Sequence, residues 1–238
     1  MKLLLTSVGA SNDSIRAALV ELLGKPIEEA SAVAVPTAMY AYPEGVRWGW
    51  ESIKSFADMG WREMGVLELT ALPTLEDAHW LSVLEAADAI LVGGGVTGYL
   101  SYWFQESGLA ERLPPLLRRG LVYVGVSAGS MVATPGLNVD RERLATTGVY
   151  YDDEYDEGSP AGAGSDAGLG LVDFAIRPHL GSEDFPGVTL AAMEAAAAKL
   201  DYPLYAIDDQ TALQVVGDTV EVVSEGEWHR FEGATDGG

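Results

Sequence analysis

The chain contains no cysteine among its 238 residues. It can therefore form neither disulfide bonds nor thiolate metal sites. It also has no apolar run of the length that crosses a bilayer, about 20 residues. Its first residues lack the longer apolar stretch and cleavage site of a signal peptide. From these absences we expect a cytoplasmic protein that does not interact with membranes.

Positive charge is scarce, because 14 lysines and arginines stand against 36 aspartates and glutamates, for a formal net charge of −22. A surface this acidic repels phosphate backbones, so we expect no nucleic-acid partner. The same charge favours solubility and would attract cationic substrates. Simple solvation of the acidic faces is the alternative.

Histidine is rare, and no group of histidine, aspartate and glutamate has the spacing of metal ligands. Gly93-Gly94-Gly95 lacks the Lys-Ser/Thr pair of a phosphate-binding P-loop and the glycine spacing of a dinucleotide site. We therefore expect neither a metal nor a cofactor.

The apolar fraction of 48% is sufficient for a substantial core. No internal repeat or linker divides the chain, so residues 1–238 are expected to form one domain. Its first half alternates short apolar runs with helical patterns. The expected strands are Lys2–Leu5, Ala32–Val35, Gly65–Thr70, Ala89–Val92 and Leu121–Val126. The expected helices are Ser14–Leu23, Val46–Met59, Leu75–Ala86 with Thr74 as its N-cap, Tyr99–Glu106 and Leu109–Arg118.

Continuous apolar strands of this kind are typical of a sheet that is covered on both faces. Their alternation with helices predicts an α/β fold, a three-layer sandwich with a mostly parallel sheet. The second half starts with a long acidic and glycine-rich loop, Tyr150–Gly170. Turns at Gly217-Asp218 and Glu225-Gly226 then predict C-terminal β-hairpins. The elements expected there are the strands Leu171–Ile176, Leu204–Ile207, Ala212–Val216, Val220–Val223 and Trp228–Phe231, and the helix Val188–Leu200.

Gly125-Val126-Ser127-Ala128-Gly129 is the most informative motif. It follows an apolar strand and precedes a short helical pattern, which is the context of a nucleophile elbow, G-x-S-x-G. The turn would raise the Ser127 hydroxyl above the sheet edge and aim the N–H of Ala128 at a developing oxyanion. A turn without chemistry is the alternative.

A serine nucleophile needs a base, and the base needs an orienting carboxylate. Of the histidines His79, His179 and His229, His179 alone directly follows an apolar strand. Catalytic groups of open parallel sheets collect beyond the carboxyl ends of strands, which favours His179. Asp208 and Asp209 follow another strand end, and both remain candidates for the carboxylate. The order Ser, His, Asp differs from that of α/β-hydrolases and disfavours that fold.

Four blocks together resemble the peptidase E (aspartyl dipeptidase) and cyanophycinase family of serine peptidases. They are Leu91–Gly95, Gly125–Ser130, Arg177-Pro178-His179 and Ala206–Leu213. The resemblance implies a class I glutamine-amidotransferase-like fold, with the nucleophile in a strand–helix elbow. By position, Ser127 matches the nucleophile and His179 the base. Asp209 falls where the family commonly has a glutamate, with Asp208 as its rival.

The resemblance further implies an oxyanion hole formed by the backbone at Gly94, Gly95 and Ala128. Preference for an N-terminal aspartate would require a cation, for which Arg177 is the candidate. The acidic residues Glu183 and Asp184 would instead repel such a substrate or bind a free α-amino group. The expected partner is a short peptide. The oligomeric state is left open, with a homodimer as the candidate.

The expected reaction is serine peptidase chemistry on short peptides, dipeptidase-like and in one version aspartyl-specific, through an acyl-enzyme. The alternatives are a non-catalytic amidotransferase-like binding module, and a cyanophycinase or esterase activity.

Overall fold

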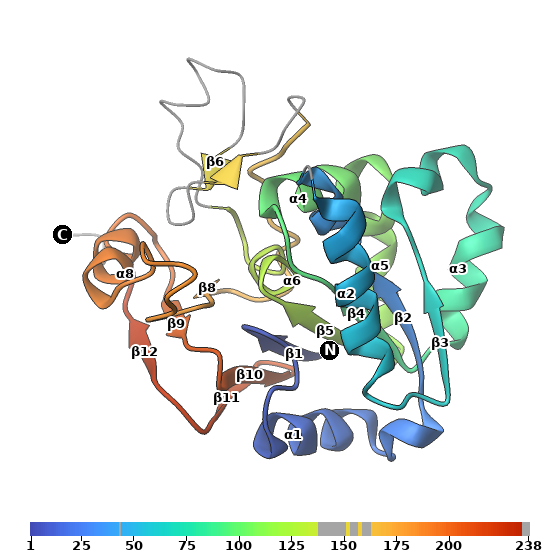
Figure 1. Ribbon diagram of the computed structural model, residues 1–238, viewed down its shortest axis with the longest axis horizontal. Coiled ribbons are helices and arrows are strands. Elements are labelled where there is room, and N and C mark those ends of the chain that lie inside the picture. Colours follow the sequence, from blue (N-terminus) through green and yellow to red (C-terminus); the bar gives the residue numbers. More distant parts are fainter. Residues whose placement is uncertain (43, 138–150, 153–156, 159–162, 235–238) are drawn as a thin grey trace.

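A seven-stranded sheet in the order β11-β10-β1-β5-β4-β2-β3 forms the centre of the computed structural model (Figure 1). The structure describes residues 1–42, 44–137, 151–152, 157–158 and 163–234. The parallel strands are β1 (Lys2–Thr6), β5 (Val122–Val126), β4 (Ala89–Val92), β2 (Ser31–Val35) and β3 (Glu63–Val66). A hairpin of β10 (Thr211–Val216) and β11 (Thr219–Ser224) adds antiparallel to β1. The expected α/β fold with a mostly parallel sheet is confirmed.

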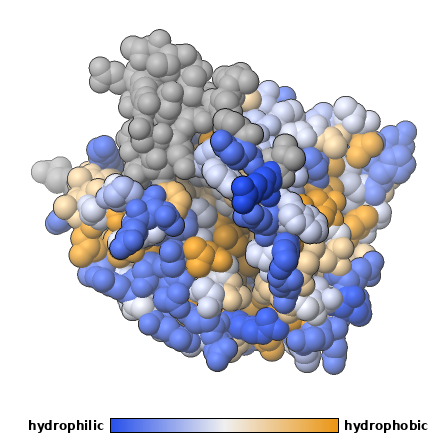
Figure 2. All heavy atoms as spheres, viewed as in Figure 1, coloured by the Kyte–Doolittle hydropathy of each residue, from blue (hydrophilic) through white to orange (hydrophobic). Residues whose placement is uncertain are grey.

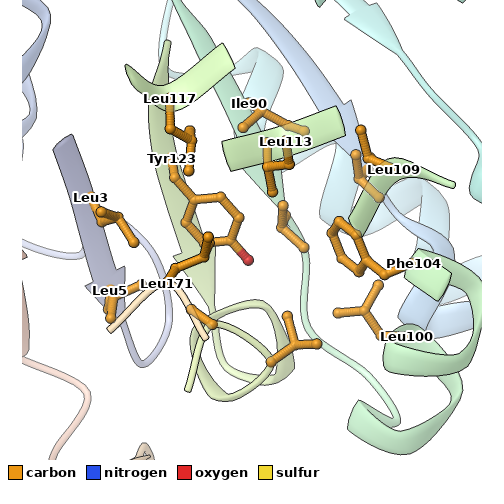
Figure 3. Close-up of a cluster of buried hydrophobic side chains, with 14 of the residues drawn as sticks. Leu3, Leu5, Ile90, Leu100, Phe104, Leu109, Leu113, Leu117, Tyr123 and Leu171 are labelled. Atoms are coloured by element: carbon orange, nitrogen blue, oxygen red, sulfur yellow. The ribbon is translucent and has the colours of Figure 1, made fainter. Parts of the chain in front are cut away.

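Helices cover both faces of this sheet, because its strands place apolar side chains alternately on each side. Leu3 and Leu5 belong to one buried cluster, which includes residues of α3, α4 and α5 (Figure 3). Leu4 belongs to another, which includes residues of α1 and Phe56 of α2. These helices are α1 (Asp13–Leu23), α2 (Gly45–Ala57), α3 (Asp77–Ala86), α4 (Thr97–Glu106) and α5 (Leu109–Arg118).

Short elements connect these layers. They are the 3₁₀ helices η1 (Ile27–Glu29), η2 (Thr37–Ala41) and η3 (Leu69–Thr74), the helix α6 (Ala128–Met131), and the strand pair β6 (Tyr151–Asp152) and β7 (Glu157–Gly158). Of the expected loop Tyr150–Gly170, the structure describes residues 151–152, 157–158 and 163–170, which include the short strand pair β6 and β7. No helix in the described part of the chain is both long and apolar enough to span a membrane.

A second sheet, in the order β12-β9-β8, stands beside the first and is partly covered by α8 (Leu190–Ala197) (Figure 1). Its strands are β8 (Ala175–Arg177), β9 (Leu204–Ile207) and β12 (Trp228–Phe231). Strand β8 runs parallel to β9, so both carboxyl ends point the same way. Residues immediately after these two ends carry the histidine and the aspartate of the site.

The second expected hairpin does not form. The turn at Gly217-Asp218 does join β10 to β11, but β12 pairs antiparallel with β9 instead of β11. Asp208 explains the change of partner, because its Oδ2 accepts a 2.6 Å bond from the N–H of Glu227 and its own N–H donates to Glu227 O. These bonds direct the chain after β11 towards β9.

Several predicted boundaries were wrong. The strand expected over Leu171–Ile176 begins only at Ala175, because Leu171 and Phe174 insert into the core from irregular backbone. The strand expected over Gly65–Thr70 ends at Val66 and is followed by η3. Thr74 is not the N-cap of α3, since its hydroxyl donates to Ala71 O and α3 begins at Asp77.

The face in Figure 2 is largely hydrophilic, with hydrophobic residues gathered in patches between the hydrophilic ones.

Candidate active site

Ser127 lies at a sharp turn between β5 and α6, with the unusual backbone angles φ 50° and ψ −113°. The glycines on either side make the turn possible by close approach. A Cβ on Gly129 would lie 2.1 Å from the carbonyl oxygen of Val92, and one on Gly125 would lie 2.6 Å from Gly129 O. The G-x-S-x-G pattern therefore has the elbow geometry that the sequence predicted.

Buried hydrogen bonds fix this elbow against the sheet. The Ser130 hydroxyl donates to Thr6 O at 2.7 Å and accepts from the N–H of Thr6 at 2.8 Å. The Tyr123 hydroxyl donates to Gly129 O at 2.5 Å, and burial raises the pKa of Tyr123 well above its ordinary value. The phenol consequently remains a donor at any physiological pH, and the first turn of α6 is held on both sides.

His179 contacts Ser127 directly. Its Nε2 lies 2.9 Å from Ser127 Oγ, within hydrogen-bond range. The residue follows β8 and Pro178 in a left-handed backbone conformation, φ 67°. The imidazole stacks on Phe185 with ring centroids 4.2 Å apart and is only 7% exposed. Its orientation is thus set by packing as well as by hydrogen bonds.

Asp209, rather than Asp208, meets the histidine. Asp209 Oδ1 lies 2.9 Å from His179 Nδ1. The carboxylate of Asp208 is used locally, because its Oδ1 accepts bonds from the N–H of Gln210 at 3.0 Å and from the Thr211 hydroxyl at 2.6 Å. Of the two neighbouring aspartates, one shapes the turn and the other reaches the imidazole.

Ser7 is a member of the site that the sequence reasoning missed. Its hydroxyl donates to Asp209 Oδ1 at 2.5 Å, accepts from the backbone N–H of His179 at 2.9 Å, and lies 3.1 Å from His179 Nδ1. Ser7 directly follows β1, which is paired in parallel with β5. The rule that selected His179, position just beyond a strand end, would also have selected Ser7.

This network assigns the histidine tautomer. The single hydroxyl proton of Ser7 goes to Asp209, so Ser7 has no proton left to donate to His179 Nδ1. Nδ1 must therefore carry the proton itself and donate to Asp209. Nε2 is left as an acceptor for the Ser127 hydroxyl. The hydrogen bond from His179, aided by that from Ser7, lowers the pKa of Asp209 despite its partial burial.

Several backbone N–H groups beside Ser127 lack a protein acceptor in the part of the chain that the structure describes. Within the described residues, those of Gly94, Gly95 and Ala128 donate no hydrogen bond to another protein group. A Cβ on Gly94 would lie 3.2 Å from that of Ser127, and one on Gly95 would lie 2.3 Å from the carbonyl carbon of Ala38. The three glycines thus allow the chain to pass very close to the nucleophile.

A cavity of about 690 Å³ opens over these groups. It is lined by Ser7, Ser127 and His179, by the Gly94-Gly95 backbone, and by side chains from η2, α2 and the segment after β8. Pockets of this size accommodate small molecules or short peptides. Within the described chain, no group of three histidine, aspartate or glutamate side chains could hold a metal ion.

The family model for peptidase family S51 matches residues 3–223. The chain belongs to peptidase family S51. Among curated members, it is 28% identical over 167 residues to peptidase E of Nostoc sp., covering 69% of this chain and 57% of that protein. It is 30% identical over 162 residues to peptidase E of Streptomyces coelicolor, covering 65% and 60%. The alignments thus span less than two thirds of these relatives.

The fold of this S51 chain matches that of a solved relative. The crystal structure of a peptidase from an acI-B1 Actinobacterium superposes with a TM-score of 0.68 at 19% identity, covering 99% of this chain and 91% of the other. At that identity the match supports the α/β fold alone.

Arg177, the sequence-based candidate for holding a substrate carboxylate, is not brought to the cavity of this family S51 chain. Its side chain is 1% exposed, its Nη1 donates to the neighbouring Ile176 O at 3.0 Å, and it is absent from the cavity lining. His229 is likewise absent from the cavity lining, and its Nε2 pairs with Glu227 Oε1 at 3.0 Å.

Proposed function

We propose that this chain is a serine peptidase that cleaves short peptides through an acyl-enzyme, with Ser127 as nucleophile, His179 as base and Asp209 as orienting carboxylate. The observation that carries the proposal is the continuous line of hydrogen bonds from Ser127 Oγ through the imidazole to Asp209 Oδ1, with 2.9 Å at each side of the ring. A cavity of about 690 Å³ over this line suits a short peptide.

In the first step, Ser127 Oγ attacks the peptide carbonyl carbon while His179 Nε2 takes its proton. The neutral tautomer assigned by Ser7 and Asp209 leaves Nε2 ready to accept. Ionised Asp209 then stabilises the imidazolium that forms, and its lowered pKa keeps it charged at neutral pH.

The negative charge that develops on the carbonyl oxygen is held by backbone N–H groups of Gly94 or Gly95 and of Ala128. Their lack of other acceptors in the described structure supports this role. Each such donor contributes about 2.7–4 kcal/mol in comparable sites. His179 next protonates the leaving amine, the C–N bond breaks, and the amine departs. Water, deprotonated by His179, then hydrolyses the ester on Ser127 and restores the enzyme.

Ser7 acts as a positioning residue in this scheme. It forms no hydrogen bond to the nucleophile within the described structure, but it bonds both Asp209 and the backbone of His179. Because the Ser7 hydroxyl donates its proton to Asp209, it has none to donate to His179 Nδ1. The histidine tautomer with an unprotonated Nδ1 is thereby excluded.

A fluorophosphonate probe tests the proposal, with intact mass spectrometry and a panel of dipeptides as readouts. We expect one label on the native chain, none on Ser127→Ala, and at least a hundredfold slower labelling of His179→Ala. Ser52→Ala is the matched control, because Ser52 lines the same cavity but does not contact His179 among the described bonds.

An unlabelled native chain that also leaves every dipeptide intact would support a non-catalytic binding module instead. Turnover of esters without any amide hydrolysis would indicate an esterase.

A further inference from the structure

The two sides of the cavity have different tasks in the proposed reaction. His179 must reach the leaving amine, so the residue that departs lies on the His179 and Phe185 side. The acyl residue must then lie towards the opposite wall. That wall adjoins the oxyanion backbone, since a Cβ on Gly95 would come within 2.6 Å of the backbone nitrogen of Met39.

This opposite wall is apolar and aromatic. The cavity lining there includes Met39 on η2, Tyr42 after it, Trp48 on α2, and Val96 at the start of α4. Tyr42 and Trp48 pack edge to face, with ring centroids 5.4 Å apart and planes at 74°. Trp48 nonetheless remains 39% exposed, so a large apolar surface beside the nucleophile is not covered by the described chain.

The described part of this lining carries negative charge and no positive charge. The described residues around the cavity include the carboxylates Glu51 and Asp184 but no lysine or arginine. Arg47, one turn before Glu51 on α2, has Nε 3.5 Å from Glu51 Oε1, is 82% exposed, and is not part of the lining. A carboxylate brought against the described lining would lose water and meet like charges instead of a cation.

From these observations we infer that the acyl side of the cavity is a specificity pocket for an apolar or aromatic residue, and that it disfavours aspartate. The inference rests on the proposed peptidase function. Met39, Tyr42 and Trp48 form the pocket wall, and Glu51 reinforces the exclusion of anionic side chains. The substrate class is therefore a short peptide with leucine, methionine or phenylalanine on the acyl side of the cleaved bond.

The p-nitroanilides of leucine, phenylalanine and aspartate provide the test on the full chain. We expect kcat/KM for the leucine and phenylalanine compounds to exceed that for the aspartate compound at least about tenfold. Equal or faster cleavage of the aspartate compound would overturn the inference. If none of the anilides is cleaved, protection of Ser127 from the fluorophosphonate decides, with Phe-Ala expected to protect at lower concentration than Asp-Ala.

Trp48→Ala and Trp50→Ala form a matched pair, since both tryptophans lie on α2 but Trp50, 63% exposed, is absent from the cavity lining. Trp48→Ala should lower kcat/KM for the phenylalanine compound about tenfold, mainly through KM, and leave fluorophosphonate labelling unchanged. Trp50→Ala should keep native kinetics. An equal loss of kcat/KM in both variants, or no loss in either, would contradict the pocket.

The two proposals fail differently. Labelling of Ser127 together with a preference for aspartate leaves the peptidase in place and removes the apolar pocket. Absence of both labelling and hydrolysis removes the peptidase, and the pocket assignment falls with it.

Discussion

Ser127 and His179 are the two non-glycine residues with positive φ in the described chain, and their side chains are 2.9 Å apart. Positive φ costs an L-residue energy, and such strain persists only where the surroundings enforce it. At Ser127 the surroundings are the close-packed glycines of the elbow, and at His179 they are the Ser7 hydroxyl and the Phe185 ring. The strained residues are the ones that meet.

Replacement of Ser7 tests its positioning role. Ser7→Ala should lower kcat about 10- to 100-fold with KM nearly unchanged, because the imidazole and Asp209 lose a shared partner while the cavity wall stays. Ser11→Ala is the control, since the Ser11 hydroxyl donates to the backbone carbonyl of the same Asp209 at 2.7 Å. Equal kinetic losses in both variants would mean a merely structural role for Ser7.

The neighbouring aspartates offer a second paired experiment. Asp209→Asn should lower kcat by up to about 10⁴-fold, because an amide in that place can favour the wrong histidine tautomer. Asp208→Asn should lower the melting temperature by weakening the turn to Glu227 and Thr211, while kcat stays within a few-fold of native. Steady-state kinetics and thermal unfolding of both variants check this, and reversed results would exchange the two roles.

The elbow glycines should tolerate no side chain. Gly129→Ala would place a methyl group 2.1 Å from Val92 O, so we expect poor folding or a loss of several kcal/mol in the free energy of unfolding. Gly65→Ala on β3 is the control, since its nearest contact would be at 4.0 Å. Urea unfolding of the two variants measures the difference. A Gly129→Ala protein as stable as Gly65→Ala would contradict the elbow geometry.

The stability contributed by Asp209 should depend on pH. Because its folded pKa is lowered by the bonds from His179 and Ser7, this contribution is fully present above the unfolded pKa of about 3.9. It is lost as the pH falls through the lowered folded value. The free energy of unfolding of native protein should therefore exceed that of Asp209→Asn most near neutrality, and the two should converge below about pH 4. A gap that widens with acidification would show that the sign is wrong.

Local sequence patterns predicted the parts of the fold that rest on local physics. The strand Ala89–Val92 and the helix Leu109–Arg118 have the bounds that their apolar patterns indicated. The glycine spacing around Ser127 likewise marked the elbow. Each glycine is needed because a Cβ there would clash with backbone in the same short segment or in the adjacent strand.

What the patterns could not provide depends on contacts between distant segments. Asp208 and Asp209 are chemically identical neighbours, and what distinguishes them is their bonds to distant residues, such as those from Glu227 and from His179. A serine after a strand, such as Ser7, is too common to stand out without the partners that surround it. The same holds for β12, whose alternation of residues does not reveal that β9 is its partner.

The central place of β1 has a consequence for the rate of folding. Lys2 pairs with Val122 on one side and with Val216 on the other, so this strand closes two very long loops. Such long-range pairing is entropically slow to form. Ser127 follows β5 and Asp209 precedes β10, so the line of hydrogen bonds from Ser127 through His179 to Asp209 is complete only after both closures. Recovery of activity during refolding should accordingly come later than the return of the helical circular-dichroism signal, and Ser127 should stay unreactive until that last step.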